Sequence, residues 1–151
     1  MVDGLGFRYF WATEGLTEKD LAYKPSKDAR TSLETIEHIN GLVEILVNTV
    51  SKKSTKFDSP PPKLSFAQLR EKTLKNIQTA SELLKKSDVK LEDLDMIFEQ
   101  GSNKSEFPFW NLINGPISDA LWHVGQVVSF RRGSGNPLPN GVNVLTGVKS
   151  N

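Results

Sequence analysis

Two residues suited to metal binding stand four positions apart in the most apolar stretch of the chain, which covers residues 107–130. Asp119 is the only charged side chain in that stretch, and His123 is one of two histidines in the protein. On an α-helix, this spacing places both side chains on one face, one turn apart. An ionised carboxylate among apolar side chains needs a partner charge, hydrogen bonds or a metal ion. The pattern therefore predicts either a metal site or a buried polar pair.

The other histidine strengthens the metal interpretation. His38 lies in the middle of a second helix-forming segment, beside the apolar stripe of Ile39 and Leu42. Two imidazoles and one carboxylate form a facial ligand set that leaves positions open for water or substrate. We expect His38, Asp119 and His123 to hold one divalent ion, which could be zinc, nickel, iron or manganese. From spacing alone, a metal-free hydrogen-bonded pair of Asp119 and His123 remains open.

Three further residues are candidates for the surroundings of this site. Gln126 is three positions beyond His123 and shares its helical face, so it can orient a ligand through an outer hydrogen bond. A polar contact across a helix interface would explain Gln126 equally well. Trp110 and Trp122 are possible walls of an apolar pocket over the site, although core packing explains them unless a cavity is present.

The residues above must be positioned by helices, because apolar residues recur with a period near 3.6. Four segments show this pattern: 5–14, 32–50, 65–84 and 108–132. Thr31 or Ser32 can cap the second helix, and Ser65 with Gln68 forms a capping-box pattern at the start of the third. The fourth contains Gly115 followed by proline, so we expect it to bend or restart there.

The connections complete the predicted fold. Residues 52–62 contain three consecutive prolines and should form a stiff surface connection after the second helix. Residues 88–106 show weak periodicity, so we assign no regular element to them, and residues 134–151 should form an irregular tail. The chain is predicted to be all-α: a four-helix bundle with one long irregular connection and a C-terminal tail, in a single domain over residues 1–151.

Composition excludes several classes of function. The 151 residues carry a formal net charge of +1, which disfavours nucleic-acid binding through a basic face. The absence of cysteine excludes disulfides, cysteine-rich zinc sites and cysteine nucleophiles within this chain. No apolar run approaches the roughly 18 residues of a membrane span, and the N-terminus lacks a secretory pattern. We therefore expect a cytoplasmic protein with no membrane partner.

The motifs together resemble a known superfamily. Residues 14–25 read Glu-Gly-Leu-Thr-Glu-Lys-Asp-Leu-Ala-Tyr-Lys-Pro, His38 follows in mid-helix, and residues 119–126 read Asp-Ala-Leu-Trp-His-Val-Gly-Gln. In this order they look like the DinB-like superfamily, whose members are damage-inducible four-helix bundles with a metal site. The resemblance implies three histidine ligands, of which His38 matches the first and His123 the last. Asp119 stands at the middle position, a departure that favours harder metals.

The resemblance also implies an activity. Some relatives carry out transfer reactions with low-molecular-weight thiols such as bacillithiol or mycothiol, and others resemble metal-dependent hydrolases. The resemblance thus implies a bacterial, stress-response enzyme that acts on a small substrate, with one divalent metal and a thiol cofactor. It also implies a homodimer that forms through the helical faces of the bundle. The metal would lower the pKa of a bound thiol or water. The first helix of relatives is longer, which suggests a trimmed N-terminus here. The alternative is a metal-free, non-enzymatic bundle that binds a small ligand or a protein partner.

Overall fold

The computed structural model of the chain describes residues 1–60 and 62–150. The protein is mainly helical, as the periodicity predicts. Its α-helices are α1 (Val2–Thr13), α2 (Glu18–Ala22), α3 (Ser32–Val50), α4 (Phe66–Leu84), α5 (Phe109–Leu112) and α6 (Ser118–Ser134). Pro61 of the predicted proline connection and Asn151 of the predicted tail lie outside the described residues. None of the described helices is both long and apolar enough to cross a bilayer.

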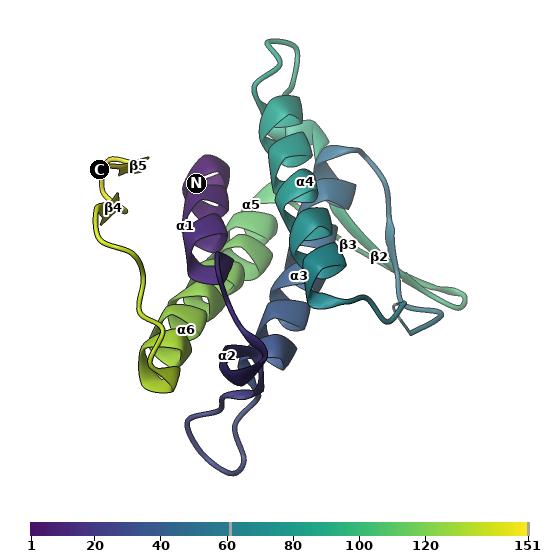
Figure 1. Cartoon of the computed structure of the whole chain (residues 1–151). Coiled ribbons are helices and arrows are strands. Elements are labelled where there is room, and N and C mark those ends of the chain that lie inside the picture. The colour runs from purple at the N-terminus through teal and green to yellow at the C-terminus, as the bar shows by residue number, and fades with distance from the viewer. Residues whose placement is uncertain (61, 151) are drawn as a thin grey trace.

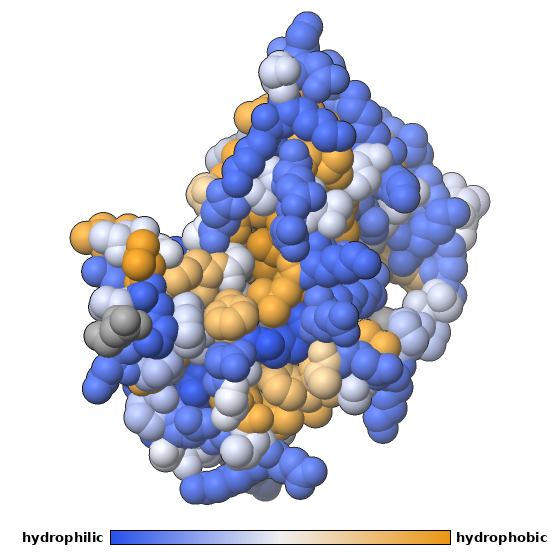
Figure 2. Space-filling model, turned by 45° about the horizontal axis from the view of Figure 1, so that its top comes forward, coloured by the Kyte–Doolittle hydropathy of each residue, from blue (hydrophilic) through white to orange (hydrophobic). Residues whose placement is uncertain are grey.

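The four longest helices surround a common core (Figure 1). Helix α1 packs on α4 and α6, and α3 packs on the same two helices. Leu5, Ile39, Ile77 and Val127, one from each helix, are at most 3% exposed. Burial of each such side chain stabilises the fold by about 1.5–3 kcal/mol. Figure 2 shows that apolar side chains also reach the surface of one face, where hydrophilic residues flank them.

Side-chain caps fix the beginnings of α3 and α4. The backbone N–H of Glu34 donates to Thr31 Oγ1 at 3.1 Å, and the Thr31 N–H donates to Glu34 Oε2 at 2.7 Å. Ser65 and Gln68 form the same reciprocal pair at the start of α4. These capping boxes satisfy N–H groups that the first helical turn leaves free. Both predicted beginnings are confirmed, and the first one sets the helical position of His38.

The last apolar stretch forms one bent helical segment. Between α5 and α6 the backbone makes a π-helical turn, Ile113–Ile117, which contains Pro116. Proline lacks an N–H, and the wider turn accommodates the missing hydrogen bond. Ser118 Oγ donates to the Ile113 carbonyl across this turn at 2.8 Å. The predicted interruption at Gly115 and Pro116 is therefore a π-helical turn, and it leads directly into the turn that carries Asp119.

The connection between α4 and α5 differs from the prediction. Instead of an irregular segment it contains a 3₁₀ turn (Leu91–Asp93) and a hairpin of β2 (Met96–Gln100) and β3 (Asn103–Phe107). Strand β1 (Thr55–Lys56) pairs with β2 in parallel, so the sheet order is β1-β2-β3. Gly101, with a φ of +58°, and Ser102 make the two-residue turn. The assignment of no regular element was wrong because β3 buries no residue and gives no hydrophobic signal.

The C-terminal tail returns along α1. It is mostly irregular, as predicted, with two short antiparallel strands, β4 (Val142–Asn143) and β5 (Val148–Lys149). Gly135, in the left-handed conformation with a φ of +96°, ends α6 and starts the tail. Arg8 Nη2 donates to the Val144 carbonyl at 3.0 Å, which holds the tail beside α1 (Figure 1).

A buried polar network joins the ends of α1, α2 and α6. Arg131 is 2% exposed and donates to the Trp11 carbonyl at 2.6 Å, close to the C-terminus of α1. Asp20 is also 2% exposed and accepts hydrogen bonds from Ser134 and Asn136. Burial of Asp20 disfavours its charge, but these bonds and those from Thr17 outweigh it and hold the pKa of the carboxyl well below its usual range.

Candidate metal centre

Helices α3 and α6 bring the three predicted ligands together. His38 Nε2 lies 3.3 Å from Asp119 Oδ2, and His123 Nε2 lies 3.3 Å from Asp119 Oδ1. One ligand atom from each residue lies within 4.8 Å of the other two. Among residues 1–60 and 62–150, this is the only set of three or more His, Cys, Asp or Glu side chains with such spacing.

Local structure explains this convergence. Asp119 lies in the first turn of α6, immediately after the π-helical turn, and His123 follows one turn later. His38 lies seven residues after the Thr31 cap, on the side of α3 that packs on α6. The two imidazole rings meet edge to face, with centroids 4.6 Å apart and planes at 85°. The Asp-x-x-x-His spacing thus predicted a real cluster.

Gln126 lies within hydrogen-bond distance of the His123 ring. His123 Nδ1 lies 2.7 Å from Gln126 Oε1. With this amide orientation the oxygen accepts, so the contact matches the tautomer of His123 in which Nδ1 carries the proton. A neutral imidazole has one N–H, and its Nε2 then presents a lone pair toward Asp119. This is the arrangement in which an outer hydrogen bond fixes the tautomer of a metal-ligating histidine.

In this tautomer of His123, a cation between His123 and Asp119 is favoured. The Nε2 lone pair of neutral His123 and the carboxylate oxygen of Asp119 are both acceptors, yet they face each other at 3.3 Å. Either a second proton on the imidazole or a metal ion between the two atoms removes the repulsion. His38 needs no cation for its contact with Asp119, since its neutral ring can donate Nε2–H to the carboxylate.

The three donor atoms lie close enough together to share one small cation. Zinc–nitrogen and zinc–oxygen bonds of about 2.1 Å at tetrahedral angles place neighbouring ligand atoms roughly 3.4 Å apart. The two separations of 3.3 Å join His38 Nε2 to Asp119 Oδ2 and His123 Nε2 to Asp119 Oδ1, so each imidazole faces a different oxygen of the carboxylate. The side chains of His38 and Asp119 are 35% and 45% exposed, so further coordination positions face solvent. The set offers three possible protein ligands and a side that is open to solvent.

Asp119 is half-exposed, so it is not part of the buried polar pair that was the alternative to a metal site. Its side chain is 45% exposed, although its neighbours in sequence are almost all apolar. Only one side of α6, which includes Ala120, Val124 and Val127, faces the core. Asp119 instead lies where α6 borders a hollow at the surface, and water can solvate its charge.

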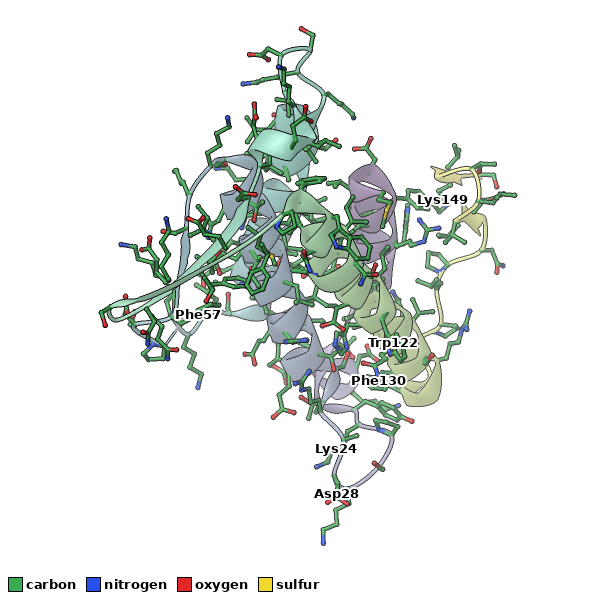
Figure 3. All side chains as sticks on the ribbon, turned by 180° about the vertical axis from the view of Figure 1, so that it is seen from behind. Lys24, Asp28, Phe57, Trp122, Phe130 and Lys149 are labelled. Carbon is green, nitrogen blue, oxygen red and sulfur yellow. The ribbon has the colours of Figure 1, made fainter. Side chains whose placement is uncertain are left out.

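That hollow lies directly beside the cluster. Its volume is about 540 Å³, and its lining residues are Leu42, Asn114, Gly115, Pro116, Ser118, Asp119 and Trp122. Trp122 projects from the outer side of α6 and is 72% exposed (Figure 3). Trp110 is 61% exposed and is not a lining residue, so only one of the two predicted tryptophans borders the hollow. Sequence reasoning did not identify Asn114 and Ser118, although the neighbouring Gly-Pro pair marked the bend that exposes them.

Comparison of the chain with protein-family models, with curated proteins and with solved structures finds no match. The DinB-like resemblance therefore rests on the motifs in residues 14–25, at His38 and in residues 119–126. The metal hypothesis rests on a separate observation, the convergence of the three side chains.

Proposed function

We propose that His38, Asp119 and His123 bind one divalent metal ion, and that the chain is a DinB-like four-helix-bundle metalloprotein. The observation that supports this proposal best is the convergence of the three side chains, in which one ligand atom from each residue lies within 4.8 Å of the other two. Asp119 in place of a third histidine makes the set richer in oxygen. It suits zinc, iron, nickel and manganese better than softer ions.

The activity we propose is thiol-dependent transfer or hydrolysis on a small substrate. A bound divalent ion supplies Lewis acidity, which lowers the pKa of a water or thiol at its open positions. Gln126 holds the tautomer of His123, and Asp119 balances the charge of the site. Leu42 and Trp122 provide apolar contacts for a substrate in the adjoining hollow. The chain has no cysteine, so a reacting thiol must come from a small cofactor.

Elemental analysis by mass spectrometry tests the metal site. Untagged protein, purified without nickel or chelator, should contain about one equivalent of metal, and His123→Ala should contain none. Ser129→Ala is the matched control, since Ser129 is an exposed residue of the same helix. A positive result would justify a screen of thiol-transfer and hydrolysis substrates. Equal metal content in the wild type and His123→Ala would refute the ligand assignment.

A second candidate function follows from the ion-pair geometry. Asp119 lies at ion-pair distance from both rings, so a protonated His123 can satisfy the carboxylate without metal. The protein would then be a non-enzymatic bundle that binds a small ligand in the hollow or a protein partner. Purified protein without metal, and with no thermal stabilisation on addition of any divalent ion, would favour this function.

A further inference from the structure

Strand β3 forms an open edge of the small sheet. It is the last strand in the order β1-β2-β3, and all five of its residues are exposed. In the part of the chain that the structure describes, no strand pairs with its outer side. The β2–β3 hairpin extends to one side of the helices (Figure 1). An edge of this kind can pair with a further strand through its free backbone groups.

The pairing within the sheet shows which backbone groups face outward. The Phe57 N–H donates to the Glu99 carbonyl at 3.1 Å, so Glu99 directs its backbone toward β1 and away from β3. Glu99 and its partner Lys104 are therefore a non-hydrogen-bonded pair of the β2–β3 ladder. Because these pairs alternate along the strand, Lys104 and Glu106 both point their N–H and C=O groups to the open side.

The charges on this edge are self-complementary. Lys104 and Glu106 lie two residues apart, hence on the same face of β3, with side chains 53% and 52% exposed. They form an ion pair with each other at 2.5 Å along the strand. Ser105 stands midway between them. Two such strands running antiparallel about a twofold axis at Ser105 would place each lysine opposite the glutamate of the other copy.

We propose that this edge binds a second copy of the same chain, with the two β3 strands paired antiparallel about Ser105. In this register the outward backbone groups of Lys104 meet those of Glu106 in the second copy, and each pair exchanges two hydrogen bonds. The side chains of the same residues form an ion pair between the copies at both positions. Pro108 has no N–H and ends the ladder one step beyond Phe107. The three strands of each copy become one continuous sheet.

This interface is independent of the metal proposal and differs from the homodimer that the family resemblance implies. That dimer would form through helix faces, whereas this one uses only the hairpin edge. A second copy is favoured over another extended chain because the Lys-Ser-Glu order complements itself without any change of register. Exposed ion pairs are screened by salt, so the association should weaken as ionic strength rises.

Analytical ultracentrifugation of the full chain, with chelator present, tests the proposal. The wild type should show a concentration-dependent dimer. Lys104→Glu converts both cross-strand ion pairs into like-charge pairs, so the dissociation constant should rise roughly 10- to 100-fold. Glu106→Lys should have the same effect. The double variant Lys104→Glu/Glu106→Lys restores opposite charges and should dimerise like the wild type.

A mixture of the two single variants gives the sharpest control. At a concentration just sufficient for the wild type to dimerise, each variant alone should be mostly monomeric. The mixture should form a heterodimer, because one copy then carries two negative and the other two positive side chains at the edge. Unfolding of a variant cannot produce this recovery. Lys104→Pro removes an outward N–H, which an edge strand tolerates, and should abolish the dimer while its circular dichroism stays unchanged. A wild type that is monomeric at every concentration, or a dimer insensitive to both single variants, would overturn the proposal.

Discussion

The substitution Asp119→Asn separates metal binding from packing, because it keeps the shape of the side chain and removes its charge. The Asp119 side chain is 45% exposed, and ion pairs at such sites stabilise by about 0–1 kcal/mol. In the presence of chelator, we therefore expect the free energy of unfolding to change by less than about 1 kcal/mol. A fully buried carboxylate would have predicted a far larger change on loss of its charge.

With metal present, the same substitution should have a large effect. A ligand at 100 times its dissociation constant stabilises the folded protein by about 2.7 kcal/mol. For a domain of about 150 residues, each kcal/mol moves the Tm by about 2–4 °C, so saturating metal should raise the wild-type Tm by roughly 5–11 °C. Asp119→Asn should lose most of this increase, because a neutral amide oxygen is a weaker ligand than a carboxylate.

The matched variant is Asp119→His, which supplies an imidazole at the same position. It should retain the metal-dependent increase in Tm, since the resemblance implies a histidine there and neutral imidazole suits the same ions. The assay is thermal unfolding followed by circular dichroism, with chelator and with a series of divalent ions. A full increase in Tm for Asp119→Asn would refute Asp119 as a ligand. A loss of more than about 3 kcal/mol in chelator would show that the carboxylate has a structural role instead.

Three further predictions concern other parts of the protein. Gln126→Leu removes the hydrogen bond to the His123 imidazole and should weaken metal binding by about 10- to 100-fold in a chelator-competition titration. Asp20 has a folded-state pKa below its ordinary value of 3.8. Its ionised form therefore stabilises the fold above about pH 4, and this stabilisation is lost as the pH falls toward the folded-state pKa. Asp20→Asn should thus destabilise the protein by about 1–3 kcal/mol at pH 7 and flatten its acid unfolding curve. Gly125→Ala, with no atom within 4 Å of the added Cβ, should stabilise α6 by up to about 1 kcal/mol in urea unfolding. Gly133→Ala should not, because its Cβ would lie 2.3 Å from the Tyr23 hydroxyl oxygen.

Each of these predictions has a contradicting result. Unchanged metal affinity in Gln126→Leu would mean that the amide does not fix the ring. An acid unfolding curve with the same slope in wild type and Asp20→Asn would mean that other carboxyls dominate acid unfolding. Equal gains from the two glycine substitutions would show that Tyr23 moves aside at no cost.

The helices of this fold could be predicted because their signals are local. Thr31 with Glu34 and Ser65 with Gln68 form reciprocal caps that need only nearby residues, and both helices begin where those caps stand. The pairing of Asp119 with His123 follows from helical geometry in the same way. The approach of His38 to this pair depends on the packing of α3 against α6, and only the structure shows it.

The β2–β3 hairpin lacked such a local signal. Strands are recognised by alternation of buried and exposed residues, but β3 is exposed throughout. Its turn, Gly101 followed by Ser102, is a known two-residue hairpin sequence and was the one available indication. The exposure of Asp119 was missed for a different reason. Apolar neighbours in sequence do not report which side of a helix borders a surface hollow.

The most direct test of the metal site is a crystal structure with diffraction data collected at the absorption edge of the metal that copurifies with the protein. We expect one anomalous peak about 2.0–2.2 Å from His38 Nε2, His123 Nε2 and an oxygen of Asp119, with His123 Nδ1 still bonded to Gln126. A structure of metal-supplemented protein with no peak between these side chains, or with the peak at another site, would contradict the assignment. It would leave Asp119 and His123 as an ion pair.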